Sequence, residues 1–289
     1  MNVTKMCECL YFHREELLDM FDEQLQGKII EKQRFPSPHP KIDLYMVSYI
    51  SNGLIVKGLL AEPKQGENLD GFLYLRGGIK NVGKVRPGRI IQFASEGFVV
   101  FAPFYRGNQG GDGDEDFAGE DRWDAINGFR LLQDHPKVNP LRVHIFGFSR
   151  GGIMALWTGI ECRDAASLVT WGGVTDMVLT YKERVDLRRM LKRVIGGSPN
   201  KAEEDYEERT PLSEVSCIQC KVLIIHGKKD QNVSIEHAQL LEKALRENGK
   251  QVETWFFNEY THYFPPQKNR QIVADLTKWM KRSAPNGTM

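Results

Sequence analysis

One serine of this sequence lies in a setting suited to covalent chemistry, the pentapeptide Gly-Phe-Ser-Arg-Gly at positions 147–151. The pattern G-x-S-x-G is typical of a sharp turn from a strand into a helix, and that turn exposes the serine hydroxyl. The apolar run 143–146 precedes the motif, and a helix-forming stretch begins near residue 150. We therefore predict that Ser149 is a nucleophile.

A hydroxyl becomes a good nucleophile when a base takes its proton, and in proteins with this motif the partners follow in the order serine, acid, histidine. Asp230 comes directly after the apolar run 222–226, and His262 follows the last such run, 253–257. We predict that Asp230 orients His262 and that His262 is the base. The acyl-enzyme would then be hydrolysed by water that the same histidine activates.

Two neighbouring residues bear on this assignment. His237 is the other histidine after Asp230, and it falls within a predicted helix, where we expect it at the surface. Ser234 stands near the start of that helix and is expected to cap it, which leaves Asp230 free for His262.

These residues need a scaffold, and the pattern of the chain indicates an α/β-hydrolase fold. Dense apolar runs alternate with helix-forming stretches, which is typical of a mostly parallel, doubly wound sheet. The strands are expected at 71–75, 98–102, 143–146, 168–171, 222–226 and 253–257, and the helices at 86–96, 120–133, 150–162, 234–248 and 267–281. An antiparallel hairpin is expected before them at 42–50 and 54–61, with Asn-Gly at its turn. Ligands of such sheets bind beyond the carboxyl ends of the strands.

The length of 289 residues fits a single domain spanning 1–289. Residues 1–40 are expected to form a helical extension, with an amphipathic helix at 13–33, and 173–215 a possible small lid or a solvated surface excursion.

Bulk composition excludes several classes of function. The net charge of +1 gives no reason to expect nucleic acid, and no long apolar run predicts a membrane span. The charged beginning of the chain is unlike a secretory signal, and five cysteines are an odd number, so we expect reduced thiols in the cytoplasm. Cys217-x-x-Cys220 alone supplies too few ligands for zinc. No cofactor or metal is expected, and the oligomeric state is not readable.

Taken together, these residues resemble the catalytic domain of the prolyl oligopeptidase (S9) family over roughly residues 45–282. The resemblance rests on an ordered set of segments: 73–78, 105–107, 110–111, 123–124, 135–140, 147–152, 226–230 and His262. It implies a serine hydrolase with Ser149, Asp230 and His262 in the catalytic roles. Larger members carry an amino-terminal β-propeller, for which the residues before the hairpin leave no room, so oligopeptide gating is not expected.

The resemblance also implies an oxyanion hole formed by backbone N–H groups. One donor should be Arg150, which follows the nucleophile, and the second Gly78 or its neighbour. The family often has His or Tyr before the Gly-Gly pair, whereas this chain has Arg76. Arg76 either favours a substrate carboxylate or the oxyanion, or is a structural arginine paired with a nearby carboxylate.

A run of acidic residues follows Arg106, at positions 112–121. It could bind a cation or a substrate amine, or form a solvated loop that pairs with Arg106 and Arg122. Asp124 resembles a structural aspartate of the family.

Two classes of function remain open. The first is a hydrolase that cleaves an ester or a small peptide or amide bond through an acyl-enzyme, with a carboxylesterase on small-molecule esters as the alternative. The second is a non-catalytic binding scaffold of the same fold, which the presence of all three candidate residues disfavours. The expected partner is a small ester or short peptide.

Overall fold

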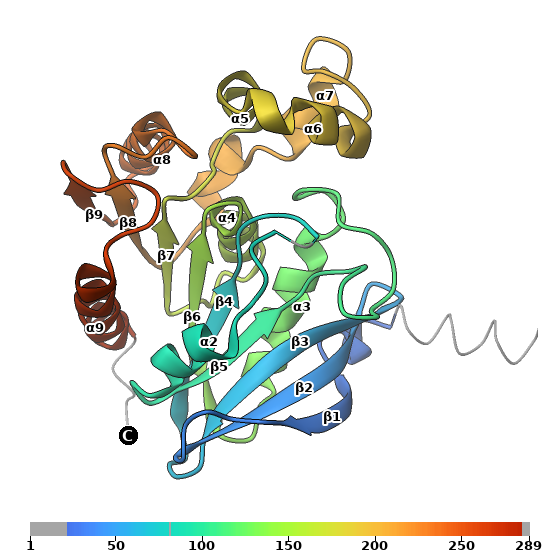
Figure 1. Cartoon of the computed structure of the whole chain (residues 1–289), viewed down its shortest axis with the longest axis vertical. Coiled ribbons are helices and arrows are strands. Elements are labelled where there is room, and N and C mark those ends of the chain that lie inside the picture. Colours follow the sequence, from blue (N-terminus) through green and yellow to red (C-terminus); the bar gives the residue numbers. More distant parts are fainter. Residues whose placement is uncertain (1–21, 81, 285–289) are drawn as a thin grey trace, which may run out of the picture.

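Nine strands form one sheet at the centre of the protein (Figure 1). The computed structural model describes residues 22–80 and 82–284. In sheet order the strands are β1 (Ile29–Phe35), β2 (Ile42–Ser51), β3 (Leu54–Pro63), β5 (Phe98–Pro103), β4 (Leu69–Leu75), β6 (Val138–Phe148), β7 (Ser167–Trp171), β8 (Lys221–Gly227) and β9 (Val252–Phe257). Along this sheet order, neighbouring strands are antiparallel from β1 through β2 and β3 to β5. From β5 through β4 to β9 they are parallel. The predicted mostly parallel sheet with an antiparallel amino-terminal part is confirmed.

Helices cover both faces of the sheet, as a doubly wound topology requires. One face carries α3 (Arg122–Gln133), α4 (Gly151–Glu161) and α8 (Ile235–Glu247), and the other carries α2 (Pro87–Ala94) and α9 (Pro266–Ser283). Successive side chains of a strand point to opposite faces, so the buried strands contribute to both cores. In β4, Leu73 and Leu75 pack with α3 and α4, whereas Phe72 and Tyr74 pack with α2.

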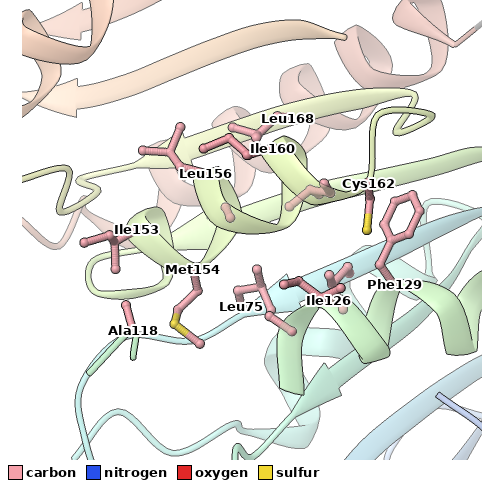
Figure 2. Packing of buried hydrophobic residues seen from close by; sticks show 14 of the residues in the cluster. Leu75, Ala118, Ile126, Phe129, Ile153, Met154, Leu156, Ile160, Cys162 and Leu168 are labelled. Atoms are coloured by element: carbon pink, nitrogen blue, oxygen red, sulfur yellow. The ribbon is translucent and has the colours of Figure 1, made fainter. Parts of the chain in front are cut away.

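The core beneath α4 holds the carboxyl edge of the sheet in place. Figure 2 shows Ile153, Met154 and Leu156 of α4 packed between Leu168 of β7 and Ile126 of α3. All five side chains are buried. Because the turn containing Ser149 joins β6 to α4, close packing of α4 limits how far that turn can move.

The prediction of an amphipathic helix at 13–33 is wrong where the structure describes it. A short 3-10 turn (Glu23–Leu25) is followed by β1, which pairs with β2. Gly27 lies between the 3-10 turn and β1 with φ of +82°, and its N–H donates to the carbonyl of Ile50. The open edge of β2 offers hydrogen bonds that outweigh local helical preference. Residues 1–21 lie outside the described residues.

The segment 173–215 contains short helices beyond the carboxyl end of β7: α5 (Met177–Glu183), a 3-10 turn (Val185–Leu187), α6 (Arg188–Ile195), α7 (Glu203–Glu208) and a second 3-10 stretch (Pro211–Cys217). Figure 1 shows α5, α6 and α7 grouped together, away from the antiparallel strands. The other predicted elements are found with ends shifted by a few residues. In the described part of the chain, no helix is long and apolar enough to cross a membrane.

Candidate active site

Ser149 occupies the turn between β6, which ends at Phe148, and α4, which begins at Gly151. Its φ is +57°, a left-handed conformation that is uncommon for a residue with a side chain. The backbone around it is held on both sides: its N–H donates to the carbonyl of Trp171 at 3.1 Å, and its carbonyl accepts the N–H of Val174 at 3.0 Å. Strain of this kind persists only where the surroundings fix it, which is common at reactive residues.

Gly77 lies against the turn and leaves room for it. A Cβ at this position would stand 2.6 Å from the Cβ of Ser149 and 3.2 Å from its Oγ. Only a residue without a side chain permits this approach. The close approach between the loop after β4 and the serine turn therefore depends on a glycine.

Asp230 and His262 meet although they come from different loops. Nδ1 of His262 lies 2.7 Å from Oδ2 of Asp230, and the other carboxylate oxygen accepts the N–H groups of Asn232 and Val233 at 2.8 and 3.0 Å. Burial raises the pKa of Asp230, but the hydrogen bond and charge of His262, with the two N–H groups, outweigh it and hold that pKa below its ordinary value. The carboxylate therefore remains charged beside the imidazole.

Ser149 and His262 line the same cavity, of about 1290 Å³, at the carboxyl edge of the sheet. The ring of Phe148 lies 4.8 Å from that of His262, which places the imidazole next to the serine turn. Within the described chain, no hydrogen bond joins Ser149 to His262. Such bonds are often long before substrate binds.

Gly78 and Arg150, the residues expected to form the oxyanion hole, both line this cavity. The carbonyl of Gly77 accepts Nη1 of Arg76 at 3.1 Å, and that of Gly78 accepts Nη1 of Arg150 at 2.9 Å. In a peptide unit the N–H points away from its C=O, so the N–H groups of Gly78 and Ile79 point away from the guanidinium groups. The N–H of Arg150 belongs to the first turn of α4, where backbone donors have no partner inside the helix.

Arg76 is a buried member of an ionic network. Its guanidinium pairs with Glu115 and also donates to the carbonyl of Phe104 at 2.7 Å. Its side chain is 3% exposed. Burial lowers the pKa of Arg76, while Glu115 raises it. The arrangement favours a structural role for Arg76, because its charge is already compensated by Glu115 and is not available to a substrate.

Glu115 is the centre of that network. Besides Arg76, its carboxylate accepts the N–H of Lys80 at 2.5 Å and lies 3.5 Å from Nη1 of Arg150. Arg150 in turn pairs with Asp121. All four charged side chains are buried, so each depends on its partners for compensation. The network thus connects the oxyanion loop to the residue that follows Ser149.

The expectation of a solvated acidic loop at 112–121 is wrong for two of its acidic residues. Glu115 and Asp121 are buried and hold Arg76 and Arg150. Neither of the arginines named for this loop pairs with it: Arg106 binds Asp124, and Arg122 binds Glu208. The structural role expected for Asp124 is confirmed. A sequence signal for this pairing existed. Arg76 and Arg150 both lie in segments that carry the family resemblance, and the acid-rich loop could supply their carboxylate partners.

His237 was also expected at the surface, which is wrong, because it is 1% exposed. Its Nδ1 accepts the N–H of Thr175 at 3.1 Å, and its carbonyl accepts the hydroxyl of the same residue at 2.9 Å. It therefore fastens α8 to the loop after β7. Ser234 does precede α8, but its hydroxyl makes no hydrogen bond to the helix. In the described residues, no group of three or more His, Cys, Asp or Glu is arranged to hold a metal ion.

Similarity to known proteins identifies the family of the chain. The family model described as prolyl oligopeptidase family matches residues 85–286. The chain belongs to this family. Membership makes the protein a hydrolase of the serine peptidase type.

Among curated relatives, the uncharacterized peptidase YtmA of Bacillus subtilis is 66% identical over 254 residues, which cover 88% of this chain and 99% of YtmA. The uncharacterized peptidase YuxL of the same organism is 24% identical over 73% of this chain, and the match spans 34% of YuxL. The chain thus matches the whole of one relative and about a third of the other.

Solved structures share the fold. A puromycin-hydrolyzing peptidase of Mycobacterium tuberculosis matches with a TM-score of 0.71 and 21% identity, covering 88% of this chain and 39% of that one. An acylaminoacyl peptidase of Pyrococcus horikoshii matches with 0.72 and 20%, covering 91% and 43%. Acetyl xylan esterase 1 of Thermoanaerobacterium matches with 0.70 and 15%, covering 92% and 93%. At these identities the likeness shows the α/β-hydrolase fold alone.

Proposed function

We propose that Ser149, His262 and Asp230 form a catalytic triad that cleaves an ester or a small peptide bond. The observation that carries the proposal is the 2.7 Å contact between His262 and Asp230, beside a serine in a left-handed turn. This combination supplies a nucleophile, an acid and a base, which follow one another along the chain in the order that the fold uses. It supports catalysis rather than a non-catalytic binding scaffold.

In the acylation step, Ser149 Oγ attacks the carbonyl carbon of the substrate while His262 Nε2 takes its proton. The carbonyl oxygen becomes negatively charged, and the N–H groups of Arg150 and Gly78 are placed to stabilise it. The carbon–leaving-group bond then breaks as His262 returns the proton to the leaving alcohol or amine. Asp230 keeps the imidazole oriented and stabilises its cation.

In the deacylation step, a water molecule replaces the leaving group. His262 takes a proton from this water, and the resulting oxygen nucleophile attacks the acyl carbon. The second tetrahedral intermediate collapses, the bond to Ser149 Oγ breaks, and Oγ recovers the proton from His262. The products are an acid and the free enzyme.

The substrate class follows from the relatives only in outline. YtmA, at 66% identity, carries a peptidase name, which supports cleavage of short peptides or acylated amines. An ester-cleaving role is the second candidate, because an acetyl xylan esterase shares the fold over 93% of its own length. Both uses require the same acyl-enzyme chemistry.

The short helices of 173–215 supply one wall of the cavity through Thr180, Arg184, Leu187 and Met190. We therefore include the segment in the proposal as a small lid over the acyl site. Three cysteines in the described residues, at 162, 217 and 220, are free thiols, which supports action in the reducing cytoplasm.

Fluorophosphonate labelling tests the triad directly. We expect one covalent adduct on Ser149 in the wild-type protein, detected by intact mass and peptide mapping. Ser149→Ala should give no adduct and no hydrolysis, whereas Ser213→Ala, which alters an exposed serine outside the cavity, should behave as wild type. Hydrolysis that survives in Ser149→Ala would overturn the mechanism.

A panel of nitrophenyl esters beside aminoacyl nitroanilides and acylated amino acids separates the two candidate substrate classes. We expect turnover of at least one amide if the protein is a peptidase. Turnover of esters alone would support the esterase candidate.

A further inference from the structure

The charged side chains that line the cavity are of one sign. Six of them are basic: Arg76, Lys84, Arg86, Arg89, Arg150 and Arg184. Among the described residues that line it, none is Asp or Glu. A cavity of about 1290 Å³ with this lining concentrates positive potential where the substrate must bind.

Three of the six charges are already compensated inside the protein. Arg76 pairs with Glu115, and Arg150 pairs with Asp121. Arg184 forms two contacts with Asp186, at 2.7 and 2.9 Å. These arginines therefore hold the walls of the cavity together, and the residual positive charge belongs to the other three.

Arg89 is the most firmly held of the remaining three. Lys84 and Arg86 are exposed, whereas Arg89 is half-buried. Its Nη1 donates to Oδ1 of Asn269 at 2.8 Å and to Oε1 of Gln92 at 3.1 Å. Both partners are neutral amides, and in the described residues no carboxylate lies within ion-pair distance. The guanidinium is thus oriented but not neutralised.

Trp171 forms the wall of the cavity beneath Arg89. The guanidinium carbon of Arg89 lies 5.6 Å from the Trp171 ring. The indole is 1% exposed, lines the cavity, and its Nε1 has no hydrogen-bond partner in the described part of the chain. Because the Nε1 atom is itself enclosed, the indole forms the wall of the cavity on which the Arg89 guanidinium lies.

The same tryptophan connects this region to the nucleophile. Its carbonyl accepts the N–H of Ser149 at 3.1 Å, and its ring packs on Phe264 at 5.0 Å. Phe264 follows His262 by two residues and also lines the cavity. Trp171 therefore contacts Arg89 through its ring and the serine turn through its backbone.

We infer that Arg89, held over the Trp171 indole, forms a subsite for a carboxylate of the substrate. The inference rests on the proposed function and names its substrate class: esters or amides that carry a carboxylate near the scissile bond. A planar guanidinium with free N–H groups matches a carboxylate, and Lys84 and Arg86 attract the anion to the cavity. A free substrate amine finds no acidic side chain among the described residues of its lining.

The test compares substrates that differ only in one charge. On the acyl side, the nitrophenyl hemiester of succinic acid is paired with its methyl ester. On the leaving-group side, 4-acetoxy-3-nitrobenzoic acid is paired with its methyl ester. For wild-type protein we expect kcat/KM to favour the charged member of at least one pair by about 10-fold or more, the value typical of a charge-assisted hydrogen bond.

Arg89→Met removes the charge and keeps much of the side-chain length. We expect it to lower the charged-to-neutral ratio of kcat/KM by about 10- to 100-fold, and Arg89→Lys to recover part of the ratio. Arg282→Met is the matched control, because Arg282 is exposed on α9 and does not line the cavity. It should leave the ratio unchanged.

Two results would overturn the inference. If Arg89 serves only to join α2 to Asn269 of α9, Arg89→Met would lower the thermal midpoint and affect both members of a pair alike. Equal turnover of charged and neutral substrates by the wild type would also overturn it. Absence of fluorophosphonate labelling at Ser149 would instead overturn the proposed function.

Discussion

Nη1 of Arg150 donates to the carbonyl of Gly78 at 2.9 Å, so the residue that follows the candidate nucleophile also holds the loop opposite it. The two expected oxyanion donors are thereby joined by a side chain of one of them. Glu115 completes the connection, since it accepts the N–H of Lys80 and pairs with Arg76. A network of buried charges can in this way position backbone groups that do chemistry.

Glu115→Gln tests this positioning role. The substitution keeps the shape of the side chain but removes the charge that compensates Arg76. We therefore expect the free energy of unfolding to fall by about 2–4 kcal/mol. We also expect kcat to fall about 10-fold or more, with a smaller change in KM, because oxyanion donors act mainly on the transition state. Steady-state kinetics and denaturant unfolding measure the two effects.

Asp114→Asn is the control for that variant. Asp114 belongs to the same loop, is exposed, and its ion pair with Lys80 spans 3.6 Å at the surface. It should change neither kinetics nor stability appreciably. A Glu115→Gln protein with lowered stability but unchanged kcat would show that the network is structural only.

Gly172→Ala should damage the site through the contact between His262 and Asp230. A Cβ at Gly172 would lie 3.2 Å from Nδ1 of His262 and 3.3 Å from Oδ2 of Asp230, and the residue has φ of +53°. We expect kcat/KM to fall by about 10- to 100-fold, because misplacement of catalytic groups by a fraction of an ångström is costly.

Gly249→Ala is the matched control for the strain in that variant. Gly249 has φ of +66°, and a Cβ there would meet nothing within 4 Å. Both variants should lose about 1 kcal/mol of stability from the left-handed backbone. If Gly249→Ala lost as much kcat/KM as Gly172→Ala, the effect would not come from the site.

Asp230→Asn should lower kcat by about 10³- to 10⁴-fold, since the imidazole then loses the charge that stabilises its cation and the acceptor that sets its tautomer. Kinetics with the most active ester of the panel measure this. Combining Asp230→Asn with Ser149→Ala should give no further loss beyond Ser149→Ala, because members of a triad act as a unit. Additive losses would contradict a shared mechanism.

Glu62 should make stability depend on pH between about 4.5 and 2. Burial raises the pKa of Glu62, but hydrogen bonds with His135, at 3.2 Å, and with Lys32 outweigh burial and lower that pKa to about 2. A carboxyl whose pKa is lower in the folded state stabilises the fold above its ordinary pKa, and this contribution disappears as pH falls toward the folded value.

The measurement is urea unfolding of wild type and Glu62→Gln from about pH 7 to about pH 3. At neutral pH we expect the wild type to be more stable by about 2 kcal/mol, with the difference shrinking below about pH 4.5. A difference that stays constant across the range would show that the carboxylate does not contribute through its charge.

Much of the fold was predictable because it is encoded in neighbouring residues. The dense apolar runs located the parallel strands from β4 to β9, since a strand buried on both faces must be apolar throughout. The region of β1 was mispredicted as helix, because its hydrogen-bond partner, β2, is supplied only by the folded sheet. Helical periodicity cannot reveal an open strand edge.

The sequence by itself determined the type of chemistry. The spacing of glycines around Ser149 requires a tight turn, and the order of Asp230 and His262 after later strands requires them at the same sheet edge. These features are local patterns joined by a topology with few alternatives. The contact between His262 and Asp230 then follows from the fold.

Only the tertiary structure decided which charges are compensated. Arg76 stood beside the predicted oxyanion loop, but Glu115, 39 residues away, neutralises it. Arg89 belongs to no sequence motif, and its guanidinium is oriented by a hydrogen bond to Asn269, 180 residues away. The pairing and burial of a charge depend on contacts between distant parts of the chain, and these contacts determine whether an arginine supports the fold or remains free for a substrate.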